Sequence, residues 1–128
     1  MSGSIKSYRD LEVWQKGMAL VKEVYQFTTH FPSEEKFSLV NRMRRAAVSI
    51  PSNLAEGQAR STTGQFQHFI YIALGSVAEL ETWIPLRSEL GYLKADICQH
   101  LLDQLETIGK MLRGLDKTLT NRKSLAHT

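Results

Sequence analysis

Four stretches of the chain repeat apolar residues at spacings of three and four, and this periodicity limits the fold more than any other feature. That spacing places the apolar side chains along one stripe of an α-helix. No stretch has the sustained alternation of apolar and polar residues that marks a half-buried strand. With 128 residues, the chain has the length of a single domain. We therefore predict one all-α domain, 1–128, with helices at 10–29, 34–57, 63–90 and 95–120 and a flexible tail at 121–128.

The connections between these helices are short, which favours an antiparallel up-down-up-down four-helix bundle. The apolar seam of the last helix runs from Cys98 to Leu119 with the spacing of coiled-coil-like packing. The first helix carries two seams, one through Trp14 and Met18 and the other through Val13 and Leu20. A helix with two apolar seams either lies between two neighbours or offers one seam to another subunit.

Two prolines fall inside predicted helices. Pro51 removes a backbone donor from the second helix, but the apolar seam continues in phase to Leu54. We therefore expect a kink near Ile50 rather than a helix end. Pro85 is expected either to kink or to shorten the third helix, and Gly91 is the expected C-terminal stop.

The sequence lacks the residue patterns of common enzyme and metal sites. It contains no Glu-x-x-His pair, no glycine-rich phosphate loop and no Gly-x-Ser-x-Gly element. Its single cysteine, Cys98, lies in an apolar seam and is predicted to be a core residue. We expect no enzyme activity, metal or cofactor, although a small-ligand pocket in the bundle core stays open. No signal peptide or membrane-spanning run is evident, so we expect a cytoplasmic protein.

The charge is unevenly distributed around a net value of +3. Lys110, Arg113 and Lys117 lie roughly 180° from the apolar positions Leu112 and Leu115 by the ~100° helical rotation per residue, so we expect them to face outward. Such a face is either simply solvated or a surface for the phosphates of RNA. The residues predicted to contact nucleic acid are Arg42, Lys110, Arg113, Lys117, Arg122 and Lys123.

Another set of charged residues flanks the apolar seams of the second and third helices. Opposite charges near a core suggest an ion network, and we expect Glu56 to face the interior, where a charge must be paired. The alternative is that these long side chains flank the seams and reach solvent. The predicted network consists of Arg44, Arg45, Glu56, Glu79 and Glu81.

Three blocks of sequence carry a family resemblance. They read DLEVWQK at 10–16, RRAAVSIPSNLAEG at 44–57 and ALGSVAELET at 73–82. Together they resemble the 23S rRNA intervening-sequence proteins, a bacterial family of four-helix bundles. The chain departs from the family pattern at Arg42, where glutamine is common, and at 83–85.

This resemblance implies a bundle that assembles into a ring-like homopentamer. It also implies kinship with accessory proteins of diversity-generating retroelements, which bind a reverse transcriptase and nucleic acid. The charged residues at 44, 45, 56, 79 and 81 match motif positions of the family. We therefore predict a non-enzymatic homo-oligomer that binds structured RNA or a ribonucleoprotein. The alternative is a protein-interaction scaffold or an accessory subunit, for example of a reverse transcriptase, with incidental nucleic-acid contact.

Overall fold

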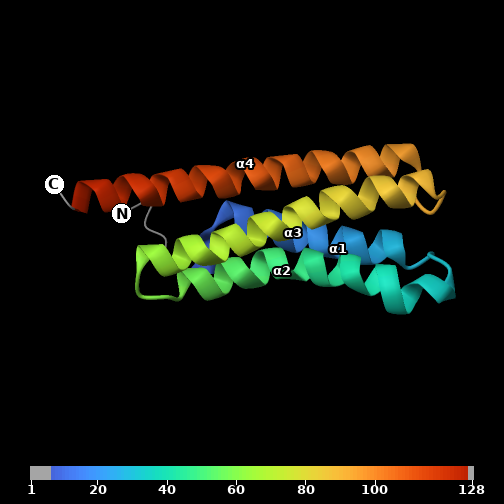
Figure 1. Ribbon diagram of the computed structural model, residues 1–128, viewed down its shortest axis with the longest axis horizontal. Coiled ribbons are helices and arrows are strands. Elements are labelled where there is room, and N and C mark those ends of the chain that lie inside the picture. The colour runs from blue at the N-terminus through green and yellow to red at the C-terminus, as the bar shows by residue number, and fades with distance from the viewer. Residues whose placement is uncertain (1–6, 127–128) are drawn as a thin grey trace.

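The computed structural model describes residues 7–126, without the side chains of residues 35–37 and 124–126. It contains four long helices, α1 (Glu12–Thr28), α2 (Asn41–Gln58), α3 (Thr63–Glu89) and α4 (Ala95–Ala126), and no strand within residues 7–126. The helices lie side by side (Figure 1). The α1–α2 and α3–α4 connections lie at one end of the molecule, and the α2–α3 turn lies at the other. The prediction of an all-α fold with four helices is confirmed.

A single apolar core runs along the bundle. Every helix contributes to it, and its fully buried members include Leu20, Ile50, Leu80 and Leu105. Burial of one such side chain stabilises the fold by about 1.5–3 kcal/mol. Cys98 is only 8% exposed, which confirms its prediction as a core residue. The α2–α3 contact is the most extensive in the bundle, and the α1–α4 contact is the least extensive of those between neighbouring long helices.

The ends of two helices differ from the prediction. A 3-10 turn (Ser33–Glu35) and a π-helical turn (Lys36–Val40) precede α2, so the regular α-helix begins at Asn41. The predicted end of the last helix at 120 is wrong, because α4 continues to Ala126. Gln67 on α3 anchors this extension by hydrogen bonds with Thr120 at 2.9 Å and Lys123 at 3.4 Å. Residues 127 and 128 of the predicted tail lie outside the described residues.

Neither internal proline ends its helix. Pro51 is buried within α2, which continues to Gln58. Pro85 lies within α3, which is not shortened and continues to Glu89. Gly91 stops α3 as predicted, with a positive φ of 84°. The N–H of Tyr92 donates 2.9 Å to the Arg87 carbonyl oxygen, the pattern of a glycine-terminated helix.

One helix, α3, is long and apolar enough to cross a membrane when only length and composition are considered. Core helices of soluble proteins also meet that criterion. In this bundle α3 packs against both α2 and α4, and Ile70, Val77 and Ile84 form part of the shared core. Part of its apolar surface is thus used for packing within the domain, and a third of the apolar window is buried.

Candidate nucleic-acid interface

The outer face of α4 carries a row of exposed basic side chains, Lys110, Arg113 and Lys117, which we call the α4 stripe. Nζ of Lys110 lies 3.2 Å from Oε1 of Glu106, and the lysine side chain remains 70% exposed. A surface ion pair of this kind contributes at most about 1 kcal/mol, so Lys110 can exchange its partner for a phosphate at little cost. Within the described chain, Arg113 and Lys117 form no ion pair.

Arg122 and Lys123 lie apart from the α4 stripe. Nζ of Lys123 donates to Oε1 of Gln67 at 3.4 Å. Arg122 lines a hollow of about 270 Å³ beside the α2–α3 turn, and Arg60 lines the same hollow. The last predicted residue, Arg42, lies on α2. The structure therefore distributes the six predicted residues over three surfaces rather than one.

Arg42 lines a groove of about 380 Å³ between α2 and α3, which we call the α2–α3 groove. Arg45, also exposed, lies in the same groove one helical turn along α2. The side chains of α3 in the groove include a carboxylate and an indole. The remaining lining residues are Ala46, Ser49, Ser76, Glu79 and Trp83.

The prediction that Glu56 faces the interior is wrong for the single chain. Its side chain is 55% exposed, and Oε1 accepts a hydrogen bond of 2.9 Å from Arg60, one turn later on the same helix. Glu56 is exposed because residue 56 lies about 200° around the helix from the buried Leu54. Proximity in sequence to the apolar seam was therefore a poor guide to burial.

The other members of the predicted ion network are also separate from one another. Arg44 is half-buried, and its Nε donates 2.9 Å to Oγ1 of Thr28. Its guanidinium also lies over the Tyr25 ring, 4.4 Å from the centroid. The exposed members of the set are Arg45, Glu79 and Glu81. Among the side chains that the structure describes, no ion pair joins any two of the five predicted residues.

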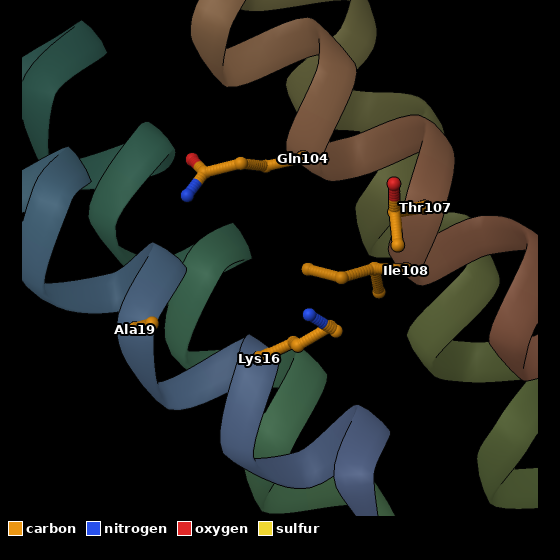
Figure 2. Close-up of a pocket in the computed structure, with 5 residues that line it drawn as sticks. All are labelled: Lys16, Ala19, Gln104, Thr107 and Ile108. Carbon is orange, nitrogen blue, oxygen red and sulfur yellow. The ribbon is translucent and has the colours of Figure 1, made fainter.

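A cavity of about 170 Å³ lies between α1 and α4. Figure 2 shows Lys16 of α1 and Gln104 of α4 extending into the gap between the two helices. Oε1 of Gln104 and Oε2 of Glu23 are buried and have no hydrogen-bond partner within the described chain. Oε1 of Glu23 lies 2.9 Å from Nε2 of His100 and links the two helices. The cavity is smaller than the roughly 300 Å³ at which ordinary ligand pockets begin.

Asp116 connects α4 to α3. Its Oδ1 accepts a hydrogen bond of 2.9 Å from Nε2 of Gln67. A hydrogen bond to the same carboxylate raises the pKa of Tyr71 above its ordinary value of 10.0, and desolvation and the negative charge of Asp116 raise it further. The acidic residue within the basic end of α4 is therefore directed toward α3, away from the α4 stripe.

Two exposed apolar surfaces accompany the basic residues. On the α1–α2 face, Trp14, Met18 and Val48 line a shallow groove of about 240 Å³. On α3, Tyr71 and Ile72 are 54% and 39% exposed. The seam of the first helix that runs through Trp14 and Met18 was the sequence signal for the α1–α2 surface. The exposed residues of α3 had no such signal, because they lie within a generally apolar helix.

No cluster of metal-binding side chains is present in the part of the chain that the structure describes. Three or more His, Cys, Asp or Glu residues do not come together anywhere in it. Cys98 is a free and buried thiol.

Sequence comparison identifies the family. The profile described as 23S rRNA-intervening sequence protein matches residues 9–114, most of the chain. The chain belongs to this family. Within the matched region lie Arg42, Lys110 and Arg113, whereas Lys117, Arg122 and Lys123 follow it. No curated protein matches the chain.

A solved structure supports the same fold for this member of the 23S rRNA-intervening sequence protein family. It is described as a protein with unknown function from the S23 ribosomal protein family of Bacteroides thetaiotaomicron VPI-5482. The two chains share 21% sequence identity, and they superpose with a TM-score of 0.74 over 82% of this chain and 98% of the other. At that identity the similarity concerns the fold.

Proposed function

We propose that this protein is a non-enzymatic, homo-oligomeric, up-down-up-down bundle of the cytoplasm that binds structured RNA or a ribonucleoprotein through basic surface residues. The observation that carries the proposal is the α4 stripe, in which three cations share one exposed helix face. Lysine and arginine bind phosphates by releasing counterions and do so without reading the base sequence. The membership of the chain in the 23S rRNA-intervening sequence protein family supports an RNA-related role.

Self-association is the second part of the proposal. The exposed apolar residues on α1 and α2 form one surface, and those on α3 form another. Contact between two different surfaces is heterologous, and such contacts close into a ring when the rotation allows it. We propose the ring of five that the family resemblance implies. Five chains of +3 each would carry a charge of +15, and repeated weak phosphate contacts would then add through avidity.

The α4 stripe is tested by neutralising all three of its residues to glutamine and measuring RNA binding by fluorescence anisotropy. A charge-matched control neutralises three exposed cations on other surfaces, Arg9, Lys22 and Lys94. We expect weaker binding only for the stripe variant, with a salt slope smaller by about 0.9 for each lost phosphate contact on a duplex. Equal affinities for the stripe variant and the control would exclude the α4 stripe as the RNA-binding surface. Light scattering should give the same mass for all three proteins.

A protein-interaction scaffold is the second candidate, for example as an accessory subunit of a reverse transcriptase. Exposed apolar residues on α3 and directly after it favour this role, among them Leu86 at 39% and Leu90 at 55% exposure. In that role nucleic-acid contact would be incidental. An intact oligomer that fails to bind RNA at low salt would favour the scaffold over the RNA-binding protein.

A further inference from the structure

The α2–α3 groove combines groups of several chemical types along one short track. A turn of four residues joins α2 to α3, and Oγ of Ser76 donates 2.8 Å to Oγ of Ser49, which sets the register of the two helices. Arg42 precedes Ser49 by seven residues, and Trp83 follows Ser76 by seven. At ~1.5 Å per residue, the groove therefore extends about 10 Å from the serine pair to Arg42 and Trp83.

The α2 side of the groove supplies two free cations. Arg42 and Arg45 are exposed, and neither forms a hydrogen bond or ion pair with any described residue. Each guanidinium has five N–H donors in a planar fork that fits phosphate oxygens. Arg87 is only 2% exposed, lies 5.5 Å from the centroid of the Trp83 ring and has no ion-pair partner in the described chain. The positive charge around this groove is therefore not balanced within the chain.

The α3 side of the groove supplies a flat ring and an acceptor. Nε1 of Trp83 donates 3.1 Å to Oε2 of Glu79, which holds the carboxylate at the edge of the indole. The other carboxylate oxygen, Oε1, has no hydrogen-bond partner among the described residues. Neither groove arginine pairs with Glu79 within 4.0 Å. A simple anion would be repelled by this carboxylate, so the groove fits a ligand that has an anionic part and also an edge of N–H donors.

We propose that the α2–α3 groove binds a guanosine nucleotide. Its phosphate would lie on Arg42 and Arg45, its base on the Trp83 indole, and its N1–H and N2–H groups on the Glu79 carboxylate. Guanine is the one RNA base with two adjacent N–H donors on its pairing edge, which match the two oxygens of a carboxylate. Base stacking on an aromatic side chain adds affinity without selecting a base. The volume of about 380 Å³ lies within the roughly 300–1,000 Å³ of small-ligand pockets.

The first test does not depend on RNA binding. Tryptophan fluorescence is titrated with GMP, with AMP and with inorganic phosphate. We expect GMP to quench the fluorescence and to bind about tenfold more tightly than AMP. This is the amount expected for one additional hydrogen bond to a charged group, because adenine offers a single amino group on its pairing edge. Trp83→Phe should abolish the quenching, whereas quenching that survives in this variant would come from Trp14 and would contradict the proposal.

Glu79→Gln is the decisive variant, and Glu81→Gln is its matched control. Both glutamates are exposed on α3, but only Glu79 lines the groove. Glu79→Gln should abolish the preference for GMP over AMP. AMP should still bind, at least as tightly as to the wild type because a repelling carboxylate is lost, and this binding also shows that the protein is folded. Glu81→Gln should retain the preference. Equal binding of GMP and AMP by the wild-type protein, or no binding of either, would overturn the proposal.

The second test asks whether the groove binds a free nucleotide or a guanosine within RNA. The second case rests on the proposed function. Short single strands of alternating U and G are compared with strands of alternating U and A by anisotropy. For a guanosine within RNA, we expect tighter binding of the U–G strand, loss of this preference in Glu79→Gln, and equal weakening of both strands in the α4 stripe variant.

The two proposals fail in different ways in these tests. If GMP binds with the expected preference but neither the strands nor a structured RNA binds at low salt, the groove is a site for free nucleotide and the proposed RNA binding is refuted. If both strands bind equally and GMP does not bind, the proposed RNA binding stands and the guanosine site is refuted. The mass from light scattering shows in each case that the assembly is intact.

Discussion

Replacing Gly57 with alanine should destabilise the protein, although the same change usually stabilises a helix. Gly57 is buried near the end of α2, where the helix passes α3. A Cβ atom at this position would lie 2.7 Å from Cβ of Phe69 and 3.3 Å from the Phe66 carbonyl oxygen. The first atom is fixed to the backbone of α3 and the second belongs to it, so side-chain rotation cannot relieve the contact. The two helices would have to separate.

The size of the effect follows from two opposing terms. Alanine is more favourable than glycine in a helix interior by about 0.5–1 kcal/mol. Extra volume in a well-packed core costs about 1–3 kcal/mol. We therefore expect Gly57→Ala to lower the free energy of unfolding by about 1–2 kcal/mol. For a chain of 128 residues this corresponds to a Tm lower by roughly 3–10 °C.

Gly114 provides the matched control. It lies in α4, is exposed, and has no atom within 4 Å of an added Cβ. Gly114→Ala should therefore raise the free energy of unfolding by about 0.5–1 kcal/mol. Urea and thermal unfolding of both variants are measured at one protein concentration, since self-association adds to apparent stability. A Gly57→Ala protein as stable as the wild type would refute the close α2–α3 packing at this position.

Two further predictions concern charged groups. Glu56→Gln and Glu12→Gln should each change the free energy of unfolding by less than about 0.5 kcal/mol, because both glutamates are exposed in the chain. Urea unfolding measures this change. A loss above about 2 kcal/mol for Glu56→Gln alone would contradict the exposure of Glu56. Asp116→Asn should lower the pKa of Tyr71 toward 10.0, because it removes the carboxylate that raises it. Since the folded pKa is the higher one, this interaction stabilises the fold below about pH 10 and is lost as the pH rises through the folded pKa. Tyrosinate absorbance measures the shift, and an unchanged titration in Asp116→Asn would show that the carboxylate does not control this phenol.

The helices and their order could be predicted because the apolar spacing repeats over several turns in each segment. Local signals were also sufficient where one residue acts alone, as at Gly91, whose positive φ ends α3. The end of α4 could not be predicted in this way. Residues 121–126 carry few apolar side chains in phase, and their anchor is Gln67, on a different helix.

The surface sites depended on information that a linear pattern does not contain. The position of Glu56 does not follow from its closeness to Leu54 along the chain, because two residues correspond to about 200° of rotation around the helix. The α2–α3 groove requires the register between two helices, which the contact between Ser49 and Ser76 reveals. The α4 stripe was predictable because all of its residues lie on one helix.

The most direct test of the proposed function is the salt dependence of RNA binding by the wild-type protein, with the mass determined by light scattering on the same sample. Anisotropy is measured with a structured RNA over a series of salt concentrations. We expect an oligomer whose RNA-binding constant falls steeply with salt, with a slope of about −0.9 for each duplex phosphate engaged. The α4 stripe alone supplies three cations per chain. Binding that is absent at low salt, or that does not change with salt, would refute RNA binding through the basic surface.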